Sequence, residues 1–301
     1  MRSRITLTAL ASLSALTLVA CGTSEDTESA DGAAGAELIA TTGVWADVAS
    51  AVTGVDVDAI ITGTDVDPHH FEPTAQDLAK VKAAKTVVAN GGGYDASLYS
   101  VADQDKVIFA LPPTDEHEHD HQHEHEHKHG TESLDDVEHI WYNPGKVKEV
   151  ADQVAQRAGG SSDTVDARMD AIEQKLAQIG HVHLAMTEPI AAGLIYGTEI
   201  HDITPDGYLH ATLNESEPSA QDVAEMVNVI ESGALDFLVY NPQSTNNATD
   251  RLVSAAKEHN VPIVEMSENP PAGTDFLDYM ESIVDQIAQI ASHAQPHADA
   301  H

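Results

Sequence analysis

Cysteine and basic residues are both scarce in this chain. One cysteine among 301 residues, Cys21, excludes an intramolecular disulfide and any cysteine-rich zinc site. Only 14 Lys and Arg face 50 Asp and Glu, which gives a formal net charge of −36. A chain this acidic is repelled by nucleic acids and by anionic membrane surfaces, so we exclude both as partners. The same charge suits the binding of cations, and 18 histidines are a large excess for such a chain.

The N-terminus has no apolar run long enough for a comfortable membrane span. Its apolar residues 5–20 number sixteen, whereas a spanning helix needs about 20. A basic start (Met1 to Arg4), an apolar run and small residues before Cys21 are the order of a secretory signal. The sequence Leu18-Val19-Ala20-Cys21 resembles the bacterial lipobox, in which the cysteine is lipidated and becomes the first residue. We therefore predict a lipoprotein signal peptide at 1–20 and a lipid anchor on Cys21. The alternative is an ordinary signal peptide with an incidental cysteine.

The residues that follow are small, polar and acidic. Gly22 to Gly35 reads GTSEDTESADGAAG and contains nothing to bury. We predict a flexible acidic tether at 21–35 that separates the folded part from the membrane.

From residue 36 onward, short β-prone runs alternate with helical patterns, which indicates parallel βαβ units. The predicted fold is α/β, with a lobe at 36–143, a linking helical segment at 144–180 and a second lobe at 181–301. A long helix in the linker is indicated by apolar residues at helical spacing from Val165 to Ile179. The interface between the lobes is where we expect a ligand. The strands are expected at 37–42, 55–62, 86–89, 106–110, 182–187, 235–240 and 262–266. The other helices are expected at 44–52, 74–83, 144–157, 219–232, 246–259 and 274–291.

One stretch of the first lobe has no globular character. Residues 117–129 read HEHDHQHEHEHKH, within a predicted His-rich loop at 115–130. The tract matches the metalloprotease motif HExxH by chance, because that motif needs a helix with an apolar face. We predict that the loop collects Zn²⁺-like divalent cations, which suit neutral imidazole. The alternative is a low-complexity solvated loop or a tag-like artefact. Its histidines are His117, His119, His121, His123, His125, His127 and His129.

Four potential metal ligands lie on proline-containing turns, three of them at the ends of predicted strands. Each of these turns places its ligand where the carboxyl ends of parallel strands face a crevice. Taken singly, each residue has a plain alternative as a helix cap or a surface side chain. Together, two imidazoles and two carboxylates are a plausible set of ligands for Zn²⁺ or Mn²⁺. The four are His69 (DPHHFEP), His139 (HIWYNP), Glu188 (MTEP) and Glu268 (MSENP).

These motifs resemble those of the ZnuA-like solute-binding lipoproteins of zinc and manganese ABC importers. The segment DPHHFEPT is similar to the family's first-ligand motif DPHxYEP, and HIWYNP is similar to HxWxxP. The segments TEPIAAGLIYG and SENPP stand where the family has its third and fourth ligands, the last of which is usually Asp. Asn90 to Gly93 resembles the family's turn after the third strand. The resemblance covers essentially the whole mature chain and implies His69, His139, Glu188 and Glu268 as the ligands.

The resemblance also implies a fold and a role. It implies two pseudo-symmetric parallel-sheet lobes joined by a long rigid helix, with one metal at the lobe interface. The function implied is an extracytoplasmic receptor, anchored to the outer face of the cytoplasmic membrane, that delivers Zn²⁺ to a permease driven by a separate ATPase. We expect a monomer and no enzymatic activity, because a site closed by four protein ligands leaves no position for water.

Other functions remain open at this point. Two oxygen donors favour Mn²⁺ more than a three-histidine site would, although the His-rich loop has no evident use for manganese. A metal store or buffer would hold several ions of similar affinity. A zinc hydrolase would need a positioned base, and none is evident outside the His tract. Further histidines are interpreted as surface or core residues (His181, His183, His201, His210, His259) or as a weak accessory collector in the tail (His293, His297, His301).

Overall fold

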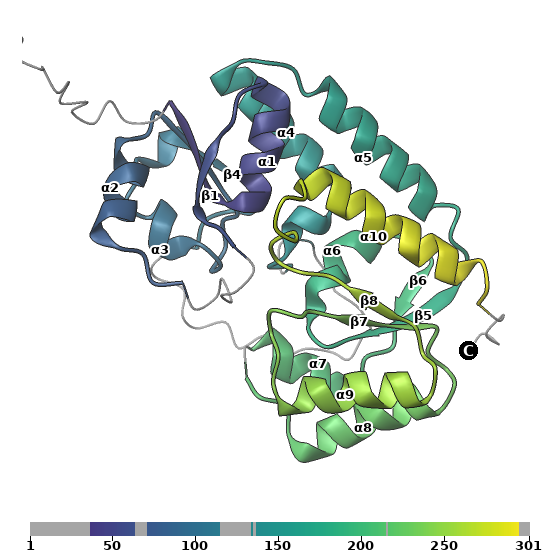
Figure 1. Cartoon of the computed structure of the whole chain (residues 1–301). Coiled ribbons are helices and arrows are strands. Elements are labelled where there is room, and N and C mark those ends of the chain that lie inside the picture. Colours follow the sequence, from purple (N-terminus) through teal and green to yellow (C-terminus); the bar gives the residue numbers. More distant parts are fainter. Residues whose placement is uncertain (1–36, 64–70, 115–133, 135–136, 215, 295–301) are drawn as a thin grey trace, which may run out of the picture. The chain divides into compact units, whose positions relative to one another are not determined.

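Two parallel four-stranded sheets organise the chain, and they have the same strand order (Figure 1). The computed structural model describes residues 37–63, 71–114, 134, 137–214 and 216–294. The order is β2-β1-β3-β4 in the first sheet and β6-β5-β7-β8 in the second. This equivalence confirms the predicted α/β fold with two related parallel-sheet lobes. The strands are β1 (Leu38–Thr42), β2 (Asp58–Ile61), β3 (Thr86–Ala89), β4 (Val107–Phe109), β5 (Val182–Met186), β6 (Ile200–Asp202), β7 (Phe237–Tyr240) and β8 (Ile263–Glu265).

The first lobe consists of short apolar strands that are covered by helices, and each helix buries one of its faces. Residues of β1 and β3 are buried on both sides of the sheet, as parallel strands covered by helices require. Helix α1 (Gly43–Thr53) buries Trp45 and Val48 against this sheet. Helix α2 (Ala75–Ala83) begins at a capping box in which Thr74 and Asp77 satisfy each other's backbone amides. The short helix α3 (Ala96–Tyr99) precedes β4.

The second lobe has the same construction. Helices α8 (Ala220–Glu231) and α9 (Asn247–Glu258) lie side by side and pack together in a separate apolar cluster, and α9 contacts β7 (Figure 1). Both begin at capping boxes, with Ser219 paired to Asp222 and Asn246 paired to Thr249. These local signals explain why the sequence located both helices to within a residue or two.

The linking segment contains the two helices that the sequence predicts, at 144–157 and along the apolar stripe from Val165, rather than the one long helix that the family resemblance implies. It consists of two helices, α4 (Pro144–Ala158) and α5 (Asp163–Leu176), which pack on each other. Gly159 and Gly160 between them have φ values of 88° and 96°, which an L side chain rarely adopts. These glycines reverse the chain between the two helices, so the segment is not one continuous helix. The predicted apolar stripe is buried from Val165 to Leu176 on α5, and Ile179 just beyond the helix is buried as well.

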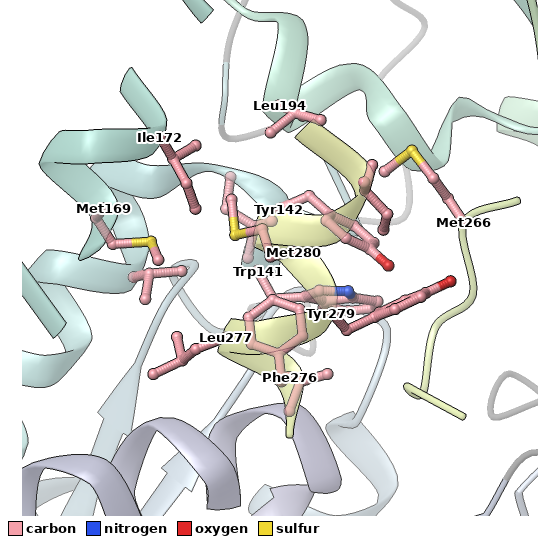
Figure 2. Close-up of a cluster of buried hydrophobic side chains, with 14 of the residues drawn as sticks. Trp141, Tyr142, Met169, Ile172, Leu194, Met266, Phe276, Leu277, Tyr279 and Met280 are labelled. Atoms are coloured by element: carbon pink, nitrogen blue, oxygen red, sulfur yellow. The ribbon is translucent and has the colours of Figure 1, made fainter. Parts of the chain in front are cut away.

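A continuous apolar core joins the two lobes through α5 and α10 (Phe276–Ala291). Figure 2 shows its centre, where Phe276, Leu277 and Met280 of α10 lie among Trp141, Met169 and other side chains. Arg168 of α5 donates to Asp278 and Glu281 of α10. The backbone N–H of Phe276 donates to Asp47 of α1. The C-terminal helix is thus attached to the linking segment and to the first lobe.

Several short elements have no recognisable signal in the sequence. They are α3, β6, α6 (Ala192–Ile195) and α7 (Asp206–Leu213), with three to eight residues each. None is long enough to display a clear period, and β6 reads Ile-His-Asp. Outside the gaps noted above, the helices between residues 37 and 294 lack the length and hydropathy that a membrane crossing requires.

Candidate metal centre

The carboxyl ends of the second sheet's strands bring polar side chains to one edge. Glu188 follows β5 by two residues, Asn241 follows β7 directly, and Glu268 follows β8 by three. The strands are parallel, so these ends meet at the same edge of the sheet. The sequence-based expectation that Glu188 and Glu268 lie at strand ends facing one place is therefore confirmed.

His139 approaches this edge from the segment that precedes α4. It lies before a turn of 3₁₀ helix at Ile140–Tyr142, whose three side chains are completely buried. The residue His139 is only 3% exposed, and its imidazole meets the ring of Trp141 edge to face, with ring centroids 5.2 Å apart. The buried side chains that follow His139 and the contact with the Trp141 ring thus fix where this imidazole points.

Three of the four predicted ligands come together. One side-chain ligand atom from each of His139, Glu188 and Glu268 lies within 4.8 Å of the other two. The distance from His139 Nε2 to Glu188 Oε1 is 3.8 Å. His139 and Glu268 are buried, and the Glu188 side chain is 13% exposed. The arrangement therefore offers one nitrogen and at least two oxygens to a single cation shielded from solvent.

Two residues that the sequence analysis did not single out hold the carboxylates. Asn241 Nδ2 donates to Glu188 Oε1 at 2.6 Å and to Glu268 Oε1 at 3.1 Å. Tyr94 donates its hydroxyl to Glu268 Oε2 at 2.7 Å from the other lobe. Asn and Tyr at turns are too common to be recognised as site residues from sequence. Their position after β7 and after β3 is the only signal that the sequence carries.

The backbone around Glu268 is held by two tyrosines. Tyr142 donates its hydroxyl to the carbonyl oxygen of Ser267 at 2.6 Å. The backbone N–H of Ser267 donates to the hydroxyl of Tyr279 at 3.0 Å. In Figure 2 both hydroxyls point toward the chain that continues from Met266. A carboxylate on a segment fixed in this way loses little conformational freedom when it binds an ion.

The turn after β3 fixes the backbone next to His139. Asn90 donates Nδ2 to the carbonyl oxygen of Glu138 at 2.9 Å and accepts from Trp45 Nε1 at 3.2 Å. Asp95 in turn accepts from the backbone N–H groups of Asn90 and Gly91. The Asn-Gly turn predicted from sequence thus lies beside the candidate centre and supports it.

Burial raises the pKa of the Glu188 carboxyl above its ordinary value, because the charged form loses solvation. The nearby Glu268 raises the pKa of Glu188 further, whereas His139 and the bond from Asn241 lower it. Two carboxylates this close and this shielded from water are costly without a compensating positive charge. A divalent cation supplies that charge, and the nitrogen and oxygen donors suit Zn²⁺ or Mn²⁺.

The remaining predicted site residues lie outside the described part of the chain. They are His69, the lipidation candidate Cys21 and the seven histidines of the tract at 117–129. Their assigned roles stay predictions.

A comparison with known protein families gives one match. The sequence profile of the family described as "ZnuA: Zinc-uptake complex component A periplasmic" matches residues 38–290. No curated protein matches the chain in sequence.

Solved structures share the fold at low sequence identity. A ZnuA structure is 17% identical with a TM-score of 0.60, covering 85% of this chain and 99% of its own. The periplasmic zinc-binding protein TroA from Treponema pallidum is 17% identical with a TM-score of 0.57, covering 85% and 97%. The solute-binding protein FpvC from Pseudomonas aeruginosa, in complex with Mn²⁺, is 12% identical with a TM-score of 0.61, covering 86% and 98%. At these identities the likeness establishes the two-lobe fold.

Proposed function

Because the chain belongs to the ZnuA family of periplasmic zinc-uptake components, we propose that it is an extracytoplasmic receptor that captures Zn²⁺ and delivers it to the permease of an ABC importer. The family binds and delivers a metal ion and does not transform a substrate. Zinc is here the cargo, so the site must hold it tightly and also release it.

The observation that carries the proposal is the convergence of His139, Glu188 and Glu268 within 4.8 Å. We assign these residues as ligands of the transported ion and add His69, from the family's first motif, as the fourth. Two imidazoles and two carboxylates complete a four-coordinate zinc site. Such a set leaves no coordination position for a reactive water, which suits a receptor better than a hydrolase.

The other parts of the proposal follow from the sequence. Cys21 carries the lipid that anchors a monomeric receptor to the outer face of the cytoplasmic membrane. The tract from His117 to His129 collects zinc, and an ATPase drives the permease that accepts it. A metal store would share the tract but would have no need of a single centre with preoriented ligands.

Manganese is the second candidate because the centre has two carboxylates beside its described imidazole. Oxygen donors suit Mn²⁺, and one structural relative was solved with that ion. Stronger binding of zinc than of manganese in vitro does not decide between them, because nearly every such site binds Zn²⁺ more tightly. The choice of cargo therefore needs a physiological test.

The test is growth of a strain that lacks the gene, under chelation that limits both metals. Added zinc should restore growth, whereas added manganese should not. A plasmid with the wild-type gene should lower the zinc concentration needed for growth. Plasmids that carry His139→Ala or Glu188→Gln should not, because each removes a ligand of the ion.

Glu265→Gln is the matched control, because Glu265 is an exposed carboxylate on β8 just before Glu268. It should restore growth as the wild-type gene does. Rescue by manganese alone would make the protein a manganese receptor. Full rescue by Glu188→Gln would show that the proposed centre does not hold the cargo.

A further inference from the structure

Histidines gather at the end of the second sheet that lies opposite the candidate metal centre. His181 precedes β5 and His183 lies within it, while Glu199 precedes β6 and His201 lies within it. Strand β5 has five residues and is therefore about 16 Å long at about 3.3 Å per residue. The group at its amino end is thus separate from Glu188, which follows its carboxyl end.

Strand pairing explains why these residues meet. His183 of β5 is paired in register with His201 of β6. His181 lies two residues before His183, and Glu199 lies two residues before His201. Side chains two positions apart in a strand share a face, so all four fall on the same side of adjacent strands. In the sequence they are 18 residues apart as His-Val-His and Glu-Ile-His, which is why they look scattered.

The side chains of this group are close enough to share one ion. His181, Glu199 and His201 each present a ligand atom within 4.8 Å of the other two. The ring centroids of His181 and His201 are 4.3 Å apart. The Nε2 atoms of His181 and His183 are 3.0 Å apart, close to the roughly 3.3 Å expected of two nitrogens on one tetrahedral zinc.

The backbone determines which nitrogen of His183 faces the group. Its Nδ1 is 3.0 Å from the carbonyl oxygen of Ala234, which can only accept a hydrogen bond. Nδ1 of the neutral ring therefore carries the proton, and Nε2 presents a lone pair toward His181. A backbone carbonyl that orients an imidazole in this way is a recurrent feature of metal-binding histidines.

We propose that His181, Glu199 and His201, with His183 beside them, form a second site for Zn²⁺ or a similar borderline divalent cation. Imidazole nitrogens with one carboxylate are donors that such ions prefer. Glu199 and His201 are exposed and His181 is half-buried, so water completes the coordination. The exposure makes this site weaker and faster to exchange than the buried centre.

The experiment is zinc titration by calorimetry on the full chain. The seven histidines of the tract and the tail residues His293, His297 and His301 are first changed to Gln, which gives a background without these competing ligands. In this background, the double substitution His181→Ala/His201→Ala should remove one zinc ion per chain. Glu199→Gln should weaken that same ion about tenfold while the other binding event is unchanged.

His210→Ala/His259→Ala is the matched control, because both histidines are exposed and lie outside the group. It should bind as many zinc ions as the background. Circular dichroism establishes that the variants are folded. An equal number of zinc ions in the background and in His181→Ala/His201→Ala would overturn the second site, whatever happens at the centre formed with His139.

Discussion

At the scale of single residues, an amide organises the candidate centre. Asn241 uses the two hydrogens of one nitrogen to hold Glu188 and Glu268, at 2.6 and 3.1 Å. These bonds favour the charged form of each carboxyl and offset part of their repulsion. The carboxylates are thereby kept together in an orientation that a cation can use. From the sequence alone, Asn241 looks like an ordinary turn residue before a proline.

Asp95 is a buried carboxyl that supports the centre from a distance. Thr41 donates its hydroxyl to Asp95 Oδ2 at 2.5 Å, and the backbone of Asn90 and Gly91 donates to the same carboxyl. Despite these bonds, loss of solvation raises the pKa of Asp95 to about 6. In the unfolded chain an Asp titrates near ~3.9. The folded protein therefore keeps this proton to a higher pH than the unfolded chain does.

This difference predicts how stability changes with pH. The protonated Asp95 carboxyl contributes up to about 3 kcal/mol to the free energy of unfolding. This contribution is complete below about pH 4 and is lost as the pH rises through about 6. Asp95→Asn cannot titrate. The free energy of unfolding of metal-free wild type, minus that of Asp95→Asn, should therefore fall by up to this amount from pH 4 to pH 7. Urea unfolding at several pH values measures it, and a difference independent of pH would contradict the prediction.

At the scale of elements, the turn from Asn90 to Gly93 allows the first sheet to support the centre. Gly91 and Gly92 both have positive φ, 84° and 58°. A Cβ atom on Gly91 would lie 2.0 Å from the carbonyl oxygen of Leu111, whereas one on Gly92 would make only an ordinary contact with the Leu111 side chain. A side chain at Gly92 would therefore cause backbone strain alone, whereas one at Gly91 would cause strain and a collision with the backbone of Leu111.

Alanine substitutions should reveal that difference. Gly92→Ala should cost about 1 kcal/mol, since φ near 60° is strained for an L residue. Gly91→Ala should cost about 3 kcal/mol, because the strain is joined by a collision with backbone that cannot turn aside. Urea unfolding of both variants measures the two costs. Equal destabilisation would mean that the close approach to Leu111 has no energetic consequence.

The elements also show what the sequence could predict. Helices such as α8 and α9 were located because their capping residues and apolar spacing are local signals. The separate patterns at 144–157 and from Val165 onward predicted α4 and α5 as two helices, and Gly159 and Gly160 lie at the break between them. Strand β6 was missed because a three-residue strand with His and Asp owes its existence to pairing with β5. Elements that are stabilised by local interactions could be predicted from local patterns, whereas a strand that forms only by pairing could not.

At the scale of the whole molecule, the candidate centre draws residues from both lobes. Tyr94 belongs to the first lobe, Glu188 and Glu268 belong to the second, and His139 lies just before the linking helices. The strand-end positions and the family motifs predicted that His139, Glu188 and Glu268 belong to one site, and the structure brings these three together. The hydrogen bonds from Tyr94 and Asn241 could not be predicted, because they depend on contacts between residues up to 174 positions apart. The second histidine group could not be predicted for the same reason, because it depends on the pairing of β5 with β6.

The most direct test of the central claim is a crystal structure of the zinc-loaded protein with anomalous data collected on both sides of the zinc edge. The account predicts an anomalous peak that lies about 2.0–2.2 Å from a His139 nitrogen and from a carboxylate oxygen of both Glu188 and Glu268. A further imidazole, assigned here to His69, should complete that ion's coordination. A fully loaded protein with no zinc in contact with His139, Glu188 and Glu268 would contradict the account.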